Sequence, residues 1–360
     1  MRVLLVHTGF LGDLLLLHPL IRKLAAADAV STLGFLTTAV GDELYRDLVG
    51  VDRIHRFEKR KRRAHVVDLV RLIRTIRGEY DVVLVAHRSH RSGLIARLSG
   101  APQRIGFGRA AGRWAYTRTV PWDGSIHVAR RYGKLARPIL GDGTVQRGLQ
   151  LPIDEASLSD VRSMLGDTGV GRGRRLAVVA PGATWATKRW TEAGFVELGQ
   201  RLVSKGFDVV VSGSAGESSL CRRIASLCEG SISLAGRTGL RHSLALFALA
   251  DVAVCNDSGS GHLAGAAGCP VVSIFGPTVP EMGYTVFSET VETVQREGLD
   301  CRPCHRHGPA RCPLRHHDCV KTVESGAVWA AVERVRRSLD LAHAPGIRRQ
   351  RLANNAHRSS

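Results

Sequence analysis

RVLLVHTGFLGDLLLLHPLIRKLAAA, residues 2–27, is the stretch that decides the fold. Its first five residues, Arg2–Val6, are almost all apolar and predict a short buried strand. A glycine-containing loop at Thr8–Asp13 follows, and the apolar run Leu14–Ala27 is long enough to predict a helix. A buried strand that passes through a glycine loop into an apolar helix is typical of the first unit of a parallel α/β sheet.

The same alternation of strand and helix patterns runs through the chain. Further strand patterns lie at Thr32–Leu36, Val82–Val85, Leu176–Ala180, Asp208–Ser212, Ser231–Leu234, Val252–Cys255 and Val271–Phe275. Helix patterns of the second half lie at Glu192–Ser204, Glu217–Leu227, Arg241–Leu249, Gly261–Ala267 and Val323–Leu341. Gly206 and Gly268 stand where helix C-caps belong. Such alternation predicts βαβ units in parallel sheets.

The stretch Leu149–Arg175 divides this alternation into two series. It is polar, rich in Gly and Asp, and contains Pro152. We therefore expect an α/β protein with two doubly wound domains, one over residues 1–152 and one over residues 153–342. Residues 343–360 contain four arginines and no acidic residue, and predict a disordered basic tail.

The composition points to a large core and an anionic partner. Apolar residues make up 44% of the 360 residues, and 51 Lys and Arg against 32 Asp and Glu give a formal charge of +19. Such an excess is typical of proteins that bind nucleic acid, an anionic membrane face or a phosphorylated substrate, although an arginine-rich genome also contributes. No run approaches the roughly 20 apolar residues of a membrane span, and no signal-peptide pattern is present. We expect a protein of the cytoplasm or of the cytoplasmic face of the inner membrane.

The loop Gly9–Asp13 lies after the first strand, where doubly wound folds place functional groups. Its spacing is G-x-x-G rather than G-x-G-x-x-G, so it does not indicate a nicotinamide cofactor. Asp13 stands before an apolar helix, and two interpretations are open. It is either the N-cap of that helix or a general base that faces a crevice.

A second motif combines small residues with positive charge. Pro181–Ala183, followed by Lys188 and Arg189, comes after the first strand of the second half. Lys and Arg at the carboxyl end of a strand can hold a diphosphate, Arg through paired donors and Lys as a point charge. A solvated basic loop has the same composition, so the motif alone leaves both interpretations open.

A third motif is the turn Asn256–His262, NDSGSGH, between a strand and a short helix pattern. Its small residues let a phosphate approach the backbone, and the N-terminus of the helix offers unpaired N–H groups and a partial positive charge. His262 falls in the first helical turn, where it is either a ligand or a satisfied, partly buried histidine. Gly276–Thr278 closes the next strand in the same way.

Together these motifs resemble glycosyltransferase family 9, the ADP-heptose:lipopolysaccharide heptosyltransferases. The motifs of this family match Gly9–Pro19 (G-x-x-G-D, an apolar run and Pro), Pro181–Trp190 (P-G-A…K-R-W), Asp257–His262 (D-[ST]-G-x-x-H) and Phe275–Thr278 (F-G-P-T), with a weaker match at Arg91–Phe107. The resemblance covers roughly residues 1–325. The motifs occur in the order of the family, and that order makes the set far more specific than any one of them.

The resemblance implies a GT-B fold, in which two Rossmann-like domains face one cleft, with the acceptor on the first domain and the donor on the second. It also implies inverting transfer, without a required cofactor or metal, of a heptose or related sugar from an ADP-sugar to an anionic acceptor of the lipopolysaccharide-core type. By the same comparison, Asp13 is the base that deprotonates the acceptor hydroxyl. The residues that would bind the donor are Lys188, Arg189, Glu217, Asp257, Ser258, Gly259 and His262, with Glu217 at the ribose hydroxyls.

Basic residues of the first half are the candidates for the acceptor. The run Lys59–Arg63 precedes an amphipathic helix pattern, and it is either a solvated charge run or a site for the carboxylates and phosphates of such acceptors. We assign acceptor contacts to Gly12, Arg60, Lys61, Arg63, Arg88 and Arg91. The chain departs from the family at His7, where Arg or Lys is frequent, and at Thr191, where Pro is frequent.

Four of the eight cysteines are grouped near the C-terminus. Cys301, Cys304, Cys312 and Cys319 form C-x2-C-x7-C-x6-C, with histidines between them. The group resembles a zinc ligand set, although its spacing is not a standard one, and an unmetallated basic surface loop is the alternative.

Two rival functions are open besides the one that the resemblance implies. The same fold could use another nucleotide sugar and another glycan acceptor. The net charge also suggests a non-catalytic protein that binds polyanions, but the basic runs contain neither interleaved aromatic residues nor a standard nucleic-acid motif. The expected partners are therefore a nucleotide sugar, an anionic glycolipid and an anionic membrane surface, and not nucleic acid.

Overall fold

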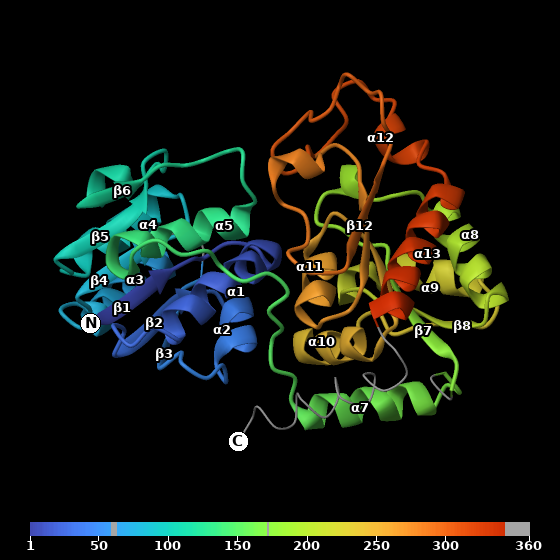
Figure 1. The fold of residues 1–360 in the computed structure, drawn as a ribbon, viewed down its shortest axis with the longest axis horizontal. Coiled ribbons are helices and arrows are strands. Elements are labelled where there is room, and N and C mark those ends of the chain that lie inside the picture. Colours follow the sequence, from blue (N-terminus) through green and yellow to red (C-terminus); the bar gives the residue numbers. More distant parts are fainter. Residues whose placement is uncertain (59–62, 171–172, 343–360) are drawn as a thin grey trace. The chain divides into compact units, whose positions relative to one another are not determined.

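The computed structural model describes residues 1–58, 63–170 and 173–342. The chain divides into two compact units, an N-terminal unit over Met1–Arg147 and a C-terminal unit that begins at Gly148. The basic tail expected at residues 343–360 lies outside the described residues. Each unit contains one six-stranded sheet and its own helices (Figure 1).

The N-terminal unit has a parallel sheet with the strand order β3-β2-β1-β4-β5-β6. Its strands are β1 (Arg2–Val6), β2 (Thr32–Thr37), β3 (Arg53–Arg56), β4 (Val82–Val85), β5 (Gln103–Phe107) and β6 (Arg118–Val120). Its helices are α1 (Leu11–Ala25), α2 (Ala39–Tyr45), α3 (Arg63–Ile76), α4 (His90–Leu98), α5 (Val128–Gly133) and α6 (Arg137–Leu140), with 3-10 turns η1 (Arg113–Ala115) and η2 (Lys134–Ala136). Fully buried Val and Leu side chains fill the central strands β1 and β4, as expected for a sheet covered on both faces.

The C-terminal unit has a second parallel sheet, in the order β12-β11-β10-β7-β8-β9. Its strands are β7 (Arg175–Ala180), β8 (Phe207–Val211), β9 (Ser231–Ser233), β10 (Val252–Asn256), β11 (Val271–Phe275) and β12 (Val291–Gln295). Its helices are α7 (Glu155–Gly166), α8 (Glu192–Ser204), α9 (Ser218–Ser226), α10 (Leu240–Leu249), α11 (Gly259–Ala266), α12 (Asp318–Lys321) and α13 (Ser325–Ala342), with 3-10 turns η3 (Ala186–Lys188), η4 (Ala215–Glu217) and η5 (Pro280–Met282). The predicted strand Val271–Phe275 and the predicted helix Glu192–Ser204 agree with β11 and α8.

The two sheets have the same strand order when each is numbered from its own first strand. In both, the first and fourth strands are neighbours, β1 beside β4 and β7 beside β10. Open parallel sheets of this order bind ligands outside the carboxyl ends of these central strands, where the order reverses. The turns after these four strands therefore mark the places to look for a site.

Helix α7 lies within the polar stretch that separates the two series of elements. Its N-cap is Asp154, whose carboxylate accepts the backbone N–H of Ser157 at 2.7 Å. Leu158, Val161 and Leu165 are buried, whereas the other residues give the segment its polar composition. This helix was not predicted from the sequence, because only one narrow apolar stripe identifies it.

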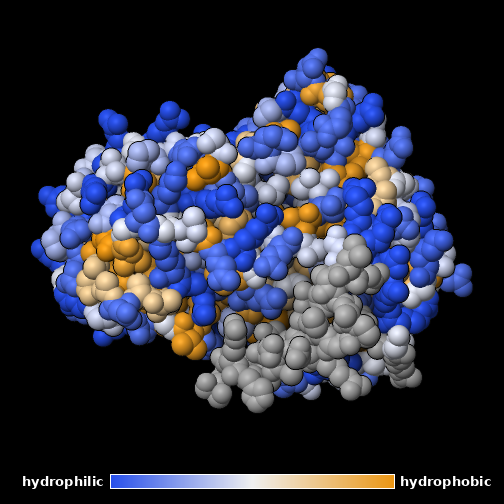
Figure 2. Space-filling view, viewed as in Figure 1, coloured by the Kyte–Doolittle hydropathy of each residue, from blue (hydrophilic) through white to orange (hydrophobic). Residues whose placement is uncertain are grey.

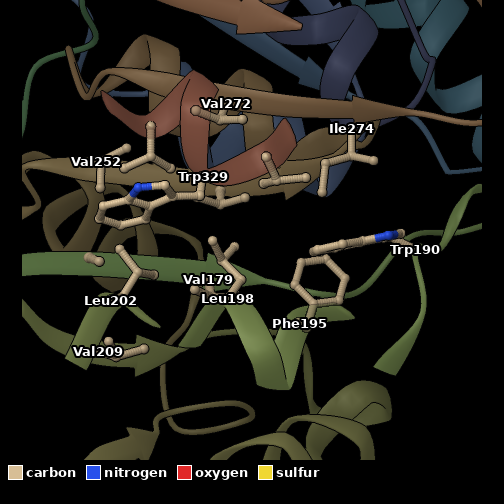
Figure 3. Close-up of a cluster of buried hydrophobic side chains, with 14 of the residues drawn as sticks. Val179, Trp190, Phe195, Leu198, Leu202, Val209, Val252, Val272, Ile274 and Trp329 are labelled. Carbon is tan, nitrogen blue, oxygen red and sulfur yellow. The ribbon is translucent and has the colours of Figure 1, made fainter. Parts of the chain in front are cut away.

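The core of the C-terminal unit fixes the segment that carries Lys188. Trp190 and Phe195 pack edge to face with ring centroids 5.0 Å apart, in a cluster that also contains Val179, Val272 and Trp329 (Figure 3). The indole N–H of Trp190 donates to the Val323 carbonyl at 2.9 Å. Because a buried indole with a satisfied N–H is a strong anchor, the chain two residues after Lys188 is held in the core.

The face in Figure 2 is mostly hydrophilic, with hydrophobic side chains in scattered patches. Among the described helices, none has the length and apolar character that a membrane crossing requires.

The predicted C-caps are confirmed, since Gly206 and Gly268 have φ values of +83° and +76° just after α8 and α11.

Candidate active site

The turn after β1 places Asp13 inside a helix rather than before it. Helix α1 begins at Leu11 and its N-cap is Phe10, so the N-cap interpretation of Asp13 is wrong. The carboxylate lies in the first helical turn, where the helix dipole favours negative charge. The residue is partly exposed, and a Cβ added at Gly9 would lie 3.3 Å from its Oδ2. The Asp13 carboxylate thus lies close to the Gly9 backbone and is partly open to solvent.

The imidazole of His7 supports this turn through a hydrogen bond to its backbone. Its Nδ1 accepts the backbone N–H of Gly9 at 3.2 Å, so the proton of the neutral ring is on Nε2, which lies 3.3 Å from the Tyr132 hydroxyl. The side chain is buried, and a Cβ at Gly9 would overlap the ring. At the position where the family often has Arg or Lys, this chain therefore has a buried imidazole that shapes the turn.

The loop after β4 lies beside the turn after β1. Nδ1 of His87 is 3.2 Å from Oγ1 of Thr8 and 3.1 Å from Oγ of Ser92, which links the two loops. The guanidinium of Arg88 lies over the Trp122 ring, 4.5 Å from its centroid, and Arg91 is partly exposed in the first turn of α4. Arg88 and Arg91 therefore belong to the same edge of the sheet as Gly12 and Asp13.

Of the three residues of the basic run that were assigned to the acceptor, only Arg63 lies within the described residues. Arg60 and Lys61 lie outside the described residues, and of Arg63 the structure gives only its place as the first residue of α3. The helix predicted after the run is confirmed by α3. The assignment of these three residues to the acceptor stays a prediction.

In the C-terminal unit, three predicted elements converge on one buried carboxylate. Nζ of Lys188, after β7, donates to Oδ2 of Asp257, after β10, at 2.5 Å. Oγ1 of Thr278, after β11, donates to the same oxygen at 2.6 Å. The side chains of Lys188 and Asp257 are only 13% and 8% exposed, so water screens this pair weakly. Lys188 is therefore held at a defined place and is not a solvated surface lysine.

Glu217 lies against the Pro181–Ala183 turn. Its Oε2 accepts from the backbone N–H and the hydroxyl of Ser214, at 2.8 and 2.7 Å, in a capping box at η4. A Cβ at Gly182 would overlap Oε1 of the same carboxylate. Only glycine leaves room there, which explains the composition of the turn.

Arg189 and Asn256 hold the same turn in place. Nε and Nη2 of Arg189 both donate to the Ala183 carbonyl, at 3.0 and 2.8 Å. The fully buried amide of Asn256 donates to the Pro181 carbonyl at 2.8 Å and accepts the backbone N–H of Trp190 at 2.9 Å. Two of the five guanidinium donors of Arg189 are thus used within the turn itself.

The N-terminus of α11 supplies hydrogen-bond donors next to Asp257, which directly precedes the helix N-cap. Ser258 is the N-cap but makes no capping bond, and its buried Oγ has no hydrogen-bond partner among the described residues. Gly259 is the first residue of the helix, and His262, in its first turn, is 9% exposed. A hydroxyl with unused capacity beside a helix N-terminus is a suitable place for an anion.

Three residues that hold this site together were not predicted from the sequence. Asn256 and Thr278 stood within recognised motifs without an assigned role, and Arg302 stood within the Cys-rich segment, Cys301–Cys319. The available signal was the position of Asn256 and Thr278 at strand ends, next to residues that were assigned. For Arg302 the sequence offered no signal, because the two carbonyls of the donor loops that it binds, Gly276 and Thr278, are 26 and 24 residues away.

The Cys-rich segment does not form a metal site in the described structure. Among residues 1–58, 63–170 and 173–342, no three His, Cys, Asp or Glu side chains are arranged to hold a metal ion. Sγ of Cys301 is 4.0 Å from Nε2 of His316. Burial is the main cause that raises the pKa of the Cys304 thiol, and it raises that of Cys319 to about 11. The described residues thus contain no ligand set for the zinc ion that the cysteine spacing suggested.

Comparison with known proteins gives one consistent result. The model of glycosyltransferase family 9 (heptosyltransferase) matches residues 69–310. Lipopolysaccharide heptosyltransferase 1 of Pseudomonas aeruginosa PAO1 is 30% identical over 326 residues, which are 84% of this chain and 86% of the relative. The glycosyltransferase family 9 structure from Veillonella parvula has a TM-score of 0.81 and 19% identity, over 94% of this chain and 97% of that one. For the E. coli ADP-heptose lps heptosyltransferase II the values are 0.76 and 21%, over 94% and 100%.

These likenesses bear on fold and on family separately. The two structural neighbours share under a quarter of their residues with this chain and show its fold, which confirms the predicted GT-B class of two Rossmann-like α/β domains. The family model spans more than half of the chain, and the Pseudomonas relative is 30% identical over 84% of this chain. The protein is a glycosyltransferase, and it belongs to glycosyltransferase family 9, the heptosyltransferases.

Proposed function

We propose that this enzyme transfers a heptose, or a related sugar, from an ADP-sugar to an anionic acceptor of the lipopolysaccharide-core type, with inversion and without a metal. The observation that carries the proposal is the Lys188–Asp257–Thr278 cluster beside the N-terminus of α11. The names of the relatives supply the sugar, the acceptor class and, for one of them, the ADP-heptose donor. An alternative donor, another nucleotide sugar, fits the same cluster.

The C-terminal unit, with its boundary proposed at residue 153, would bind the donor. Lys188 gives one N–H to Asp257 and keeps two for phosphate oxygens, and the α11 amides, Ser258 and His262 add further donors. Glu217 binds Ser214 through Oε2 alone, so Oε1 can accept from ribose hydroxyls. Donors that are already oriented stabilise the charge of a leaving diphosphate as a divalent cation does.

The N-terminal unit, proposed to end near residue 152, would bind the acceptor and supply the base. The Asp13 carboxylate takes the proton of the acceptor hydroxyl while the oxygen of that hydroxyl attacks the anomeric carbon of the donor sugar. The bond to the diphosphate breaks on the opposite side, which inverts the configuration. Gly12, Arg88 and Arg91 lie at the same sheet edge and would orient the acceptor, with the basic run at Arg60, Lys61 and Arg63 as a further anionic contact.

Helix α3 supports a peripheral contact with an anionic membrane. Leu72 and Ile76 are buried, whereas Val66, Val67 and Val70 are 60%, 58% and 44% exposed. Arg71 and Arg74 of the same helix are also exposed, as is Arg77 directly after it. A helix with apolar and cationic residues on its outer face suits the surface of an anionic bilayer. Binding to vesicles with and without anionic phospholipid, for wild type and a Val66→Ser, Val70→Ser variant, tests this contact.

The decisive experiment titrates the purified protein with ADP-, GDP- and UDP-sugars. Preference for the ADP-sugar supports the proposal, and preference for another nucleotide supports the alternative donor. Lys188→Ala should weaken binding by about 1.5–3 kcal/mol, the scale of a hydrogen bond to a charged group, and His262→Ala should act in the same direction. Tight binding of polyanions without any nucleotide-sugar turnover would overturn the proposal in favour of a non-catalytic polyanion binder.

A charge-compensated variant separates donor binding from folding. Lys188→Ala leaves the buried Asp257 without its partner, which by itself destabilises a protein. Lys188→Met combined with Asp257→Asn removes both charges and should recover the melting temperature. Donor affinity should stay low in this double variant, because the phosphate ligand is still missing.

A further inference from the structure

The Cys-rich segment packs on the loops that carry the donor site. From this segment, Arg302 donates through Nε to the Gly276 carbonyl at 2.5 Å and through Nη2 to the Thr278 carbonyl at 2.9 Å. The same guanidinium reaches the end of β12, where Nη2 meets Oε1 of Gln295 at 2.8 Å and Nη1 meets the Arg296 carbonyl at 2.6 Å. One planar group therefore joins the loop after β11 to the strand beside it.

From this guanidinium, a continuous chain of hydrogen bonds leads to Lys188. Arg302 holds the Thr278 backbone, the Thr278 hydroxyl donates to Asp257, and Asp257 accepts from Lys188. A guanidinium cannot lose its proton in a protein and has a rigid fork of donors, so it fixes the carbonyls that it binds. A shift of the Thr278 backbone would change the geometry of the carboxylate that holds Lys188.

The same segment also contacts Lys188 directly. Gly308 has φ of +88°, and a Cβ there would lie 3.1, 3.2 and 3.4 Å from Cγ, Cε and Cδ of Lys188. Two hydrogen bonds hold the segment in this place, from Oγ1 of Thr187 to the Pro309 carbonyl at 2.6 Å and from the N–H of Cys304 to the Pro277 carbonyl at 3.1 Å. The aliphatic stem of Lys188 thus runs along the segment, and its ammonium is held by Asp257.

We propose that the Cys-rich segment is a part of the donor site and that Arg302 is its positioning residue. The inference rests on the proposed function of Lys188 as a ligand of the donor diphosphate. A lysine has a flexible stem, and fixing it before the ligand arrives removes part of the entropic cost of binding. Arg302 acts through Thr278 and Asp257, and Gly308 leaves the space in which the stem lies.

The first test replaces the guanidinium and compares two arginines. Arg302→Met should raise the Kd for ADP about tenfold, the effect of losing one charge-assisted contact, while the KM for the acceptor stays unchanged. Arg302→Lys should recover little of this loss, because an ammonium cannot span the same carbonyls. Arg296→Met is the matched control: its side chain is exposed, and the variant loses the same charge from a neighbouring place.

Two results would overturn the inference. If Arg302→Met and Arg296→Met raise the Kd equally, only the net charge matters. If Arg302→Met lowers the melting temperature but the folded protein keeps its Kd for ADP, the residue is purely structural. Failure of the wild-type protein to bind ADP at all is a separate outcome, which rejects the proposed donor and with it this inference.

A second variant keeps the test decisive if Arg302→Met does not fold. Gly308→Ala leaves the guanidinium intact but displaces the Lys188 stem, and should raise the Kd for ADP several-fold. The strain of a β-carbon at φ +88° is the same in both backgrounds, but in a Lys188→Ala background the change should leave the Kd for ADP almost unaltered, since the displaced group is gone. Equal effects in both backgrounds would show that Gly308 acts independently of Lys188, and would overturn the role of the segment.

Discussion

The two sheets have the same strand order, but the turns after their first strands differ in length and in charge. Between β1 and α1 the chain has only four residues, and the helix that follows carries Asp13 in its first turn. Between β7 and α8 it has a longer connection with a 3-10 turn, which carries Lys188 and Arg189. A short turn exposes an acid at a helix start, whereas a long one lets a cation bind the turn that follows a neighbouring strand.

This difference shows how one fold can supply two chemical roles. The parallel sheet determines only where a turn ends, at the carboxyl edge of the central strands. In the proposed mechanism, the residues of each turn then determine whether the edge accepts a proton, through Asp13, or neutralises a phosphate, through Lys188. In the C-terminal unit the site residues bind one another, as in Lys188, Asp257 and Thr278, whereas the Arg88 side chain stacks on Trp122.

The largest expected effect is at the acid of the short turn. Asp13→Asn should lower kcat by at least about 10²-fold, the scale of general base catalysis, because the amide cannot accept the acceptor proton. Donor affinity and melting temperature should change little. Steady-state kinetics, ADP titration and thermal unfolding of the same preparation check this, with Asp28→Asn as the control that removes an equal charge from an exposed position.

The opposite result has a clear interpretation. A large loss of stability with nearly normal kcat would make Asp13 a structural residue of the first helical turn. The two turns would then differ in shape alone, and the base would have to be sought among the other groups at the same edge, first at His87.

The next effect compares one glycine from each turn. A methyl at Gly9 would overlap the His7 ring, and a methyl at Gly182 would overlap the Glu217 carboxylate. Overpacking of this kind costs about 1–3 kcal/mol when the neighbour cannot move freely. Gly182→Ala should therefore raise the KM for the donor about tenfold and leave the KM for the acceptor unchanged, and Gly9→Ala should chiefly lower kcat. Kinetics with each substrate varied in turn distinguish the two; equal changes in both variants would contradict the separation of roles.

Much of the fold could be predicted from local patterns, each of which lies within one short stretch of the sequence. Val82–Val85 and Val271–Phe275 were predicted with the bounds that the structure shows, because buried parallel strands are short apolar runs. Helix α7 was missed because Asp154 and the polar residues around it resemble a linker. The strength of the apolar pattern, rather than the length of the element, decided these outcomes.

From the sequence, the strand end that each site residue follows could be predicted, but the contacts between these residues could not. Motifs place Lys188, Asp257 and His262 after β7 and β10, but no periodicity encodes a contact between residues 69 positions apart, such as Lys188 and Asp257. The bond from Arg302 to Thr278 is of the same kind. Long-range pairs of polar groups depend on how loops pack, which the sequence of one chain does not show.

A smaller effect is expected at the basic run of the N-terminal unit. Arg60, Lys61 and Arg63, replaced together by Ser, should raise the KM for the acceptor several-fold and flatten its dependence on salt. Exposed charges act on encounter and are screened beyond roughly 10 Å at 0.1 M salt. Arg222, Arg336 and Arg337, replaced by Ser in the C-terminal unit, remove the same charge and should leave the KM unchanged. An unaltered KM of the first variant at low salt would make the run a solvated surface, and would direct attention to Arg88 and Arg91.

The smallest expected effect is that of a chelator. If Lys188, Ser258 and the α11 amides neutralise the diphosphate, EDTA should change kcat/KM by less than about twofold, because protein donors already occupy the place of a divalent cation. Wild type and Lys188→Ala should be measured side by side with EDTA and with added Mg²⁺. Partial recovery of Lys188→Ala by Mg²⁺, with no response of the wild type, would locate the lost charge at the diphosphate. Strict dependence of the wild type on Mg²⁺ would instead mean that the long turn after β7 does not neutralise the leaving group by itself, and that its contrast with the short turn is one of structure rather than of chemistry.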